Sequence, residues 1–251
     1  MDYGKLNIIG IGPGGDEHIS FYAKDTIINS DVIVGYKKYI ELIEHLINGK
    51  EVYSTGMMGE IKRCEAAIEY VLDGKDTSVV CSGDCGIYGL AGLILEVLDK
   101  KGLINQIKVE IIPGIPAFVA CAASLGAPLM HDFACISLSD LMTSWDVIEK
   151  RIHLCGEGDF VTVIYNPKSK KRNWQIIEAI NILRKFRDEK TPVGIVKNAT
   201  RDGEKIIITN LRDIDFDEID MFTLIIVGNS KTKNIGRFMV TPRGYLEKYK
   251  V

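Results

Sequence analysis

Short runs of consecutive apolar residues alternate along the chain with longer segments in which apolar residues recur every three or four positions. The runs have the length of buried strands and the longer segments have the period of amphipathic helices, an alternation typical of an α/β fold. In the first part of the chain, strands are expected at residues 6–11, 31–34, 78–81, 109–112 and 134–138. Helices are expected at residues 20–29, 37–47, 60–72, 91–101 and 117–125.

The pattern changes near residues 139–144, where a helix expected at 144–155 leads away from the first sheet. A second helix is expected at 172–186, because its apolar residues fall on one stripe. Strands are expected at 160–165, 193–197, 206–209 and 223–227. Since no helix is expected between the last two strands, the second sheet should be mixed. The pattern therefore predicts an N-terminal α/β lobe at residues 1–140 and a C-terminal α/β lobe at residues 141–251.

Charge and hydropathy exclude two classes of partner. The net charge is −3 and the isoelectric point is near 5.9, whereas a nucleic-acid binder needs a basic excess to neutralise phosphates. No apolar run approaches the ~20 residues that would span a bilayer, and the N-terminus shows no signal-peptide pattern. The chain is therefore expected to be cytoplasmic, with neither nucleic acid nor membrane as its partner.

The six cysteines are scattered, and several of them lie inside apolar runs, so they are expected to be buried thiols and not a disulfide framework. Cys81 and Cys85 form a C-x₃-C pair. No further metal ligand lies near them at a characteristic spacing, and no metal site is expected.

A glycine-rich loop, GIGPGG at residues 10–15, follows the first expected strand and satisfies the dinucleotide-binding pattern. Two features oppose that interpretation. Pro13 lacks the backbone N–H that a pyrophosphate would need. The second expected strand ends in Gly35 and Tyr36, where a carboxylate would hold the ribose. A tight turn that only glycine can make is the other interpretation of this loop.

Two more loops follow strands in the same way, SGDCGIYG at residues 82–89 and IPGIPA at residues 112–117. Loops that follow strands of one parallel sheet gather at one rim, where open α/β sheets bind ligands. Asp84 is either a ligand-binding carboxylate or a local cap of its own turn. The occurrence of three such loops favours a binding site more than any one of them does.

In the C-terminal lobe, Tyr165-Asn166-Pro167 ends a strand, and a basic segment follows it directly. Such a run is commonly a solvated face, but its place at a strand end also suits an anion-binding site. Both interpretations stay open for Lys168, Lys170, Lys171 and Arg172.

Taken together, these segments resemble the tetrapyrrole methylases, a family of two-lobed class III methyltransferases. The three loops match the family's N-terminal motifs in order and spacing, and the resemblance covers essentially the whole chain. It is strongest to the branch that methylates C17 of a corrin precursor and contracts the macrocycle. The strings that carry this are VGYKKY at 34–39, LGAPLMHDF at 125–133, ISLSDL at 136–141, YNPKS at 165–169, NATR at 198–201, IVGNS at 226–230 and MVTPRGY at 239–245.

The resemblance implies S-adenosylmethionine as co-substrate, bound in the cleft between the two lobes. The residues it implies for the cofactor are Pro13, Gly83, Asp84, Ile87, Pro116, Ala117, Asn166, Ala199, Thr223 and Leu224. Two positions depart from the family pattern. Cys85 replaces the usual proline, which removes a fixed φ from the turn, and Pro116 replaces a common Ser or Thr.

The implied substrate is a tetrapyrrole, precorrin-3B or cobalt-factor III, which carries many carboxylates. Basic side chains suit it, arginine above all, because its guanidinium binds carboxylate bidentately. The candidates are Lys168, Lys171, Arg172, Arg201 and Arg243. Asp132 and Asp140 are the candidates for a catalytic group, and the resemblance also implies a homodimer.

Two alternatives are kept beside this function. One is a sister methylase of the same fold that acts on another tetrapyrrole position, or on a protein or RNA. The other is a nucleotide-binding module or nicotinamide-dependent oxidoreductase that uses the first loop, which Pro13 and the missing carboxylate oppose. The long strings around Asp132, Asp140 and Arg243 favour the C17-methyltransferase over the sister methylase.

Overall fold

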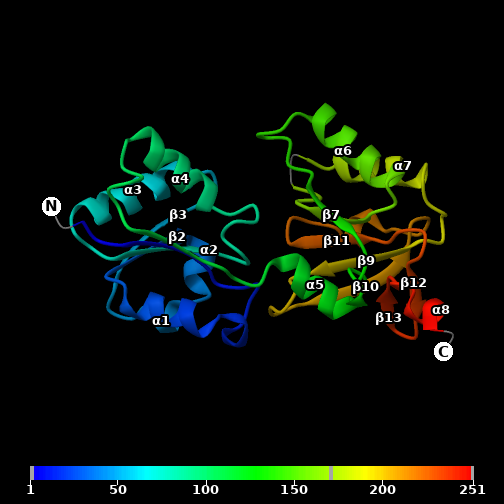
Figure 1. Cartoon of the computed structure of the whole chain (residues 1–251), viewed down its shortest axis with the longest axis horizontal. Helices are drawn as coiled ribbons and strands as arrows, with labels where there is room; N and C mark the ends of the chain where they lie inside the picture. Colours follow the sequence, from blue (N-terminus) through cyan, green and yellow to red (C-terminus); the bar gives the residue numbers. More distant parts are fainter. Residues whose placement is uncertain (1–2, 170–171, 250–251) are drawn as a thin grey trace. The chain divides into compact units, whose positions relative to one another are not determined.

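The computed structural model describes residues 3–169 and 172–249 of the 251-residue chain. The chain divides into two compact units, Met1–Ala117 and Phe118–Val251. Figure 1 shows the elements of each unit, from blue at the N-terminus to red at the C-terminus. Each unit has its own sheet and its own core, as described below.

The sheet of the first unit has five strands, all parallel, in the order β3-β2-β4-β1-β5. The strands are β1 (Leu6–Gly10), β2 (Val32–Tyr36), β3 (Glu51–Thr55), β4 (Thr77–Cys81) and β5 (Val109–Ile112). The helices are α1 (Phe21–Asn29), α2 (Lys37–Glu41), α3 (Glu60–Leu72) and α4 (Ala91–Lys100), with short 3₁₀ segments η1 (Asp16–His18) and η2 (Glu44–Leu46). Ser20 is the N-cap of α1, and its hydroxyl accepts a hydrogen bond from the Ala23 amide at 3.1 Å.

Helices cover both faces of this sheet, because alternate residues of its strands point to opposite sides. Leu6 and Ile8 of β1 are fully buried in a cluster with α3 and α4, whereas Ile9 packs in a second cluster with Ile27 of α1. Since all five strands are parallel, the loops that follow their carboxyl ends emerge at one rim of the sheet.

The hydrophobic pattern did not indicate β3. This strand, EVYST, lies at the edge of the sheet and pairs only with β2. Three of its five residues are exposed, so it has no continuous apolar run to reveal it. The helix expected at 37–47 is also interrupted, and the structure has α2 followed by η2.

The main sheet of the second unit is mixed, in the order β10-β9-β11-β8-β7, with only β7 and β8 parallel. Its strands are β7 (Phe133–Ser137), β8 (Val161–Tyr165), β9 (Pro192–Lys197), β10 (Lys205–Asn210) and β11 (Thr223–Val227). A small sheet contains β12 (Lys233–Ile235), β13 (Phe238–Val240) and β6 (Gly126–Ala127). The helices are α5 (Ala117–Leu125), α6 (Trp145–Glu157), α7 (Gln175–Arg184) and α8 (Tyr245–Tyr249), with a 3₁₀ segment η3 (Phe216–Glu218).

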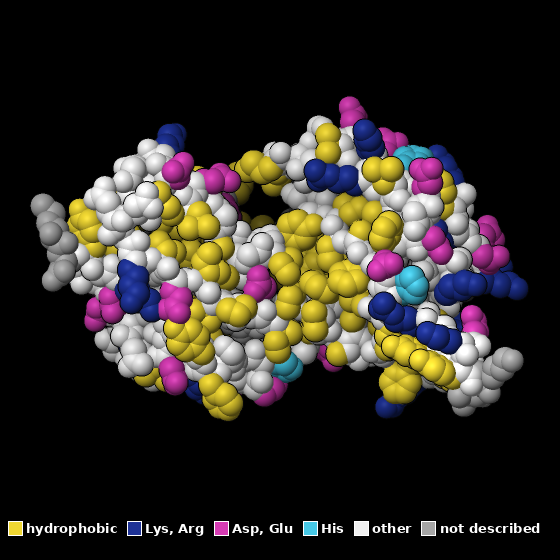
Figure 2. Space-filling model, viewed as in Figure 1, with side chains coloured by type: hydrophobic (Ala, Val, Ile, Leu, Met, Phe, Trp, Pro, Cys, Tyr) yellow, Lys and Arg dark blue, Asp and Glu magenta, His cyan; other side chains and the backbone are white. Residues whose placement is uncertain are grey.

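Helices α6 and α7 cover one face of the main sheet (Figure 1). The hydrophobic core between these helices and the sheet includes Ile148 and Ile152 of α6 and Ile176 and Ile180 of α7. Helix α5 packs on β9, where Leu125 fits against Gly194. In Figure 2, hydrophobic side chains gather over α5, whose Val119 is 43% exposed.

The division after Ala117 falls earlier in the chain than the boundary expected near residues 139–144. Strand β7, which the hydrophobic pattern had assigned to the first sheet, pairs in parallel with β8 in the second. An apolar run such as Phe133–Ser137 predicts a buried strand, but the strand that it pairs with is decided by the rest of the fold.

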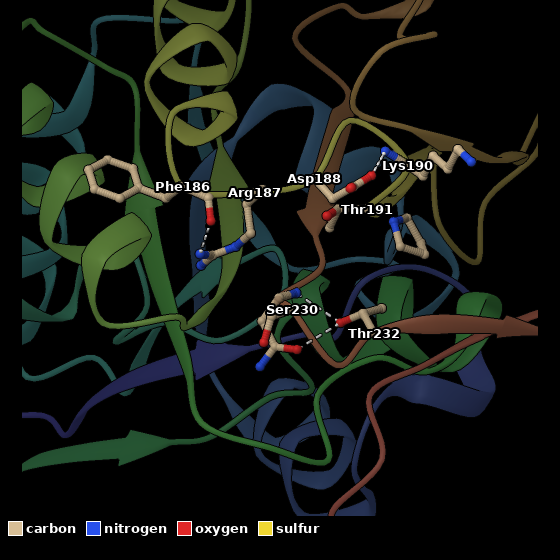
Figure 3. Close-up of a pocket in the computed structure, with 9 residues that line it drawn as sticks. Phe186, Arg187, Asp188, Lys190, Thr191, Ser230 and Thr232 are labelled. Carbon is tan, nitrogen blue, oxygen red and sulfur yellow. Dashed lines mark hydrogen bonds between the residues drawn. The ribbon is translucent and has the colours of Figure 1, made fainter.

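Arg187 stabilises the edge of the second sheet at which β8 and β9 begin. Its guanidinium is 2% exposed, donates to the carbonyls of Cys155 and Gly156 at the end of α6, at 3.1 and 2.8 Å, and forms an ion pair with Asp159 at 3.1 Å. Figure 3 shows Arg187 with Ser230 in the wall of a pocket of about 270 Å³. Burial lowers the pKa of Arg187, which the Asp159 carboxylate opposes.

Across the described ranges, the structure contains no helix that is both long enough and apolar enough to cross a membrane.

The contact between Gly194 and Leu125 predicts a stability effect. A Cβ at residue 194 would lie 2.3 Å from Leu125 Cδ1, so Gly194→Ala should overpack the core and lower the free energy of unfolding by about 1–3 kcal/mol. Gly92→Ala is the control, because a Cβ there meets nothing within 4 Å and alanine favours a helix. Urea unfolding should show Leu125→Ala compensating for part of the loss in the double variant. Independent, additive effects of the two substitutions would contradict the packing argument.

Candidate functional site

The first two glycine loops of the first unit bind each other through their backbones. Gly12 and Gly83 form an isolated antiparallel bridge, in which the Gly12 amide donates to the Gly83 carbonyl at 3.1 Å and the Gly83 amide donates to the Gly12 carbonyl at 2.6 Å. Both glycines have a positive φ, 75° for Gly12 and 67° for Gly83, a backbone conformation that residues other than glycine rarely adopt. The first two loops are therefore joined to each other at the rim of the sheet.

The third loop packs against the first two so closely that side chains are excluded. A Cβ on Gly114 would lie 2.2 Å from the Gly83 carbonyl oxygen and 2.7 Å from the Gly10 carbonyl carbon. A Cβ on Gly10 would lie 2.6 Å from the Gly114 amide nitrogen. The expectation that the three loops meet at one rim is confirmed, and glycine is required there for close approach of three backbones.

Asp84 connects the second and third loops. Its Oδ1 accepts a hydrogen bond from the Gly86 amide at 2.8 Å, and its Oδ2 accepts one from the Gly114 amide at 3.0 Å. The local-cap interpretation is therefore correct for Oδ1, and Oδ2 adds a link across 30 residues. Each carboxylate oxygen has a further lone pair with which it can accept from a ligand hydroxyl.

The other expected cofactor residues of the first unit lie beside this junction. Pro13 follows Gly12 and is buried, whereas Ile87 is 36% exposed. A Cβ on Gly83 would lie 3.4 Å from the Ala117 amide nitrogen and 3.8 Å from Pro116 Cα. The structure therefore places Gly83, Pro116 and Ala117 next to one another.

The first loop lacks the geometry of a dinucleotide site. In that motif the glycine loop opens directly into a helix whose N-terminus holds the pyrophosphate. Here the 3₁₀ segment η1 follows the loop, and α1 begins only at Phe21. This agrees with the two sequence features that opposed the dinucleotide interpretation.

Cys85 links the second loop to the neighbouring strands β1 and β5. The residue is fully buried, and its thiol donates to the carbonyls of Ile8 and Ile112, each at 3.4 Å. Burial raises the pKa of Cys81 to about 11 and that of Cys85 to about 12, so both thiols are neutral at physiological pH. All six cysteines are free, and within the described residues no group of three or more His, Cys, Asp or Glu is placed to hold a metal ion.

The expected cofactor residues of the second unit share one edge of its main sheet. Asn166 follows β8 with a positive φ of 50°, and Thr223 begins the neighbouring antiparallel strand β11. The Asn198 amide, one residue before Ala199, donates to the Phe222 carbonyl at 3.1 Å. Thr223 and Leu224 are 4% and 5% exposed, so their side chains belong largely to the core.

Asn166 is held in place by Ser137 and Arg172. Its side-chain amide donates to Ser137 Oγ at 2.9 Å, and its carbonyl accepts from Arg172 Nη2 at 2.8 Å. Desolvation lowers the pKa of Arg172, while the nearby charge of Asp140 raises it. Asp140 in turn accepts a hydrogen bond from Gln175 Nε2 at 2.8 Å. The structure thus brings together Asn166, Arg172 and Asp140, which were expected to have three different roles.

The remaining basic candidates are dispersed. Lys168 Nζ donates to the Phe216 carbonyl at 2.9 Å, and Arg201 lies in the turn between β9 and β10 at the same edge as Asn166. Lys171, with Lys170, lies outside the described residues. Arg243 lies on the other side of the sheet's length from Asn166. It follows Thr241, whose hydroxyl contacts that of Thr232, and Thr232 comes after the end of β11 that is opposite to Thr223.

The two acidic candidates are also separated. Asp132 is 79% exposed at the start of β7, whereas Asp140 follows the other end of that strand. The sequence interpretation missed Ser137 and Gln175 as partners of the candidates. Ser137 lies in the string ISLSDL that carried the resemblance, but Gln175 is 35 residues from Asp140 and no spacing rule connects them.

Comparisons with known proteins agree with the resemblance. Residues 5–215 match the model of the family described as Tetrapyrrole (Corrin/Porphyrin) Methylases. The chain is 47% identical, over 96% of its length, to a probable cobalt-factor III C(17)-methyltransferase of Salmonella typhimurium and covers 99% of that protein. It is 50% identical, over 98% of its length, to a cobalt-factor III methyltransferase of Priestia megaterium, but it spans only 46% of that longer protein.

Solved structures support the same assignment. The crystal structure of the methyltransferase CobJ matches with a TM-score of 0.91 at 32% identity, covering 95% of this chain and 100% of that one. The uroporphyrin-III C-methyltransferase of Thermus thermophilus, solved with S-adenyl homocysteine, has the same fold, with a TM-score of 0.67 at 20% identity over 90% of this chain and 97% of that one. The loops, the two α/β units and these relationships lead to one conclusion: the chain belongs to the tetrapyrrole methylase family.

Proposed function

We propose that this chain is a methyltransferase that transfers a methyl group from S-adenosylmethionine to C17 of cobalt-factor III, with ring contraction, in cobalamin biosynthesis. The observation that carries the proposal is the 47% identity to a probable C17-methyltransferase over nearly the whole of both chains. Relatives named for cobalt-factor III are 43–50% identical to this chain. A relative named for precorrin-3B is 33% identical, so the cobalt-containing substrate is favoured over the metal-free one.

The two alternatives are less well supported. A nicotinamide-dependent oxidoreductase would use the first loop at a helix N-terminus, and here α1 begins at Phe21, after η1. A sister methylase shares the fold, but the cobalt-precorrin-4 methyltransferase CbiF matches at only 24% identity with a TM-score of 0.73. The C17-methyltransferase is therefore the function that we propose.

The first unit offers a rigid backbone surface for the cofactor. The neighbouring backbones leave no room for a side chain at Gly10 or Gly114, and Gly83 has a positive φ that favours glycine. Asp84 keeps acceptor positions beside them. When bound, S-adenosylmethionine supplies an already activated methyl group. The protein's task is then to position the reactants and exclude water, and no nucleophilic side chain is needed.

The second unit supplies positive charge for the substrate's carboxylates. Arg201 lies in a turn at the edge where β8 ends, and Lys168 belongs to the loop that follows β8. Arg172 holds the backbone of Asn166, so we propose that it positions Asn166 as well as contributing charge. Arg243 and Lys171 stay proposed substrate residues on the resemblance alone.

We further propose that the enzyme acts as a cytoplasmic homodimer. The family resemblance supports a dimer, and exposed apolar side chains over α5, among them Val119, are suited to an interface (Figure 2). Sedimentation velocity should give twice the mass of the chain at micromolar concentration. A monomer under those conditions would exclude the dimer and leave the enzyme assignment intact.

The role of Asp84 can be tested through cofactor affinity. The wild type should bind S-adenosylhomocysteine in the micromolar range, about −8 kcal/mol, and should not bind NAD saturably. Asp84→Ala removes the acceptors of the Gly86 and Gly114 amides and should weaken that binding about thirtyfold, since two lost bonds of about 1 kcal/mol each amount to about 2 kcal/mol. Calorimetry with Asp99→Ala, an exposed carboxylate of α4, is the control. Unchanged affinity in Asp84→Ala would restrict the residue to a structural role.

Kinetic measurements can distinguish the roles of Arg201 and Arg172 in the second unit. Arg201→Ala should raise KM for cobalt-factor III, more at low salt than at high salt, and leave affinity for S-adenosylhomocysteine unchanged. Arg172→Ala should change both, because it also releases the Asn166 carbonyl. The expected loss is about 1.5–3 kcal/mol for a partly desolvated charged contact. Arg212→Ala, exposed at the opposite edge, is the control. Wild-type kinetics for both variants across a salt series would contradict the substrate role.

A further inference from the structure

The rim of the first unit has a second half that the proposed cofactor loops do not use. The three glycine loops follow β1, β4 and β5, whereas β2 and β3 end at the same rim with Tyr36 and Thr55 paired in register. Tyr36 belongs to the string VGYKKY, which helped to carry the resemblance but has no role in the cofactor site.

The loop after β3 presents two consecutive methionines to solvent. Met57 is 65% exposed and Met58 is 92% exposed, and Met58 has a positive φ of 63°. An unbranched apolar side chain in the left-handed region costs about 1 kcal/mol or more. The loop adopts a strained backbone conformation and exposes apolar surface, two features that are common at binding sites. We call Met57 and Met58 the methionine tip.

A buried arginine holds the loop that carries the methionine tip. Arg63 Nη1 donates to Thr55 Oγ1 at 2.6 Å and to the Gly56 carbonyl at 3.1 Å, and Nη2 contacts Glu60 Oε1 at 3.2 Å. The side chain of Arg63 is only 5% exposed, and burial of a guanidinium is costly unless hydrogen bonds compensate for it. Three such bonds, all to residues 55–60, give the loop one fixed shape.

Aromatic and basic side chains accompany the methionine tip. The Arg63 guanidinium lies 6.0 Å from the centroid of the Tyr36 ring, and Tyr36 and Tyr39 form an edge-to-face pair at 5.1 Å. The exposed cations of the adjoining helices are Lys37, Lys38 and Lys62. The acidic residues on those helices are Glu41, Glu60, which is paired to Arg63, and Glu65 and Glu69, which lie farther along α3 from the loop.

We propose that the methionine tip, with Tyr36 and Tyr39, receives the apolar face of the tetrapyrrole, while the flanking lysines meet its carboxylates. This inference rests on the proposed function. Its occupant follows from two observations: the surface continues the rim that holds the glycine loops, and it combines exposed apolar atoms with exposed lysines in the first turns of α2 and α3. A flat apolar ring with an anionic periphery is complementary to both. Methionine side chains are flexible and polarisable, which suits contact with such a ring.

Arg63 is then a positioning residue for substrate specificity. It does not face the ligand, because its guanidinium is buried beneath the loop. A lysine there would keep the charge but lose the planar fork that reaches Thr55 and Gly56 together. Arg63→Lys should therefore raise KM for the tetrapyrrole with a smaller change in kcat.

The test uses the full-length enzyme with cobalt-factor III as substrate and S-adenosylhomocysteine as the cofactor probe. Met57→Ala/Met58→Ala should raise KM for cobalt-factor III about tenfold, since each truncation removes apolar surface that the bound ring would cover, and should leave S-adenosylhomocysteine affinity within twofold. Met58→Gly removes one side chain and also the left-handed strain, so it should fold at least as stably as the wild type and show part of the KM effect. Leu246→Ala is the control, because Leu246 is 66% exposed on α8.

The outcomes separate this inference from the proposed function. If the wild type methylates cobalt-factor III and the double variant has the same KM, the inference is overturned and the proposed function stands. If the double variant changes the sedimentation coefficient but not KM, the methionine tip binds a second copy of the chain, which also overturns it. If the wild type binds S-adenosylhomocysteine but does not methylate cobalt-factor III, the proposed function fails and the inference fails with it.

Discussion

The close approach of three backbones at Gly10, Gly83 and Gly114 is the constraint on which the first unit depends. Any side chain at Gly10 or Gly114 would overlap backbone atoms within 3 Å, so the loops could not meet. The parallel sheet brings their strands to one rim, and the Asp84 carboxylate then connects the second loop to the third. If this junction binds the cofactor as proposed, its backbone atoms form a rigid surface, because they have no rotamers to order on binding.

Arginines that donate to backbone carbonyls perform the equivalent task elsewhere. Arg63 holds the loop after β3, Arg172 holds Asn166, and Arg187 holds the end of α6. In each of them Nε is buried without a hydrogen-bond partner in the described structure, so part of the desolvation cost is not recovered within the chain. These arginines therefore fix loop geometry at that cost, Arg63 and Arg172 at the edges where we propose ligand binding and Arg187 at the end of α6.

Periodicity predicted most of the fold, because buried strands and amphipathic helices have distinct spacings of apolar residues. It located α3, α5, β5 and β11 at their observed bounds. It missed β3, an edge strand with little burial, and the two-residue strand β6, which is too short to have a pattern. It also assigned β7 to the first sheet, because strand pairing depends on contacts that no local pattern describes.

By itself, the sequence determined the α/β class, the three glycine loops and the family, because these depend on residue types at short spacings. The tertiary structure decided which candidates contact one another. It brought Asp140 and Arg172 to Asn166, separated Asp132 from them by the length of β7, and directed Lys168 to the Phe216 carbonyl. It also placed Tyr36 beside Arg63, 27 positions away in the chain. Such contacts join residues far apart in sequence, so only the packing of the sheets and helices defines them.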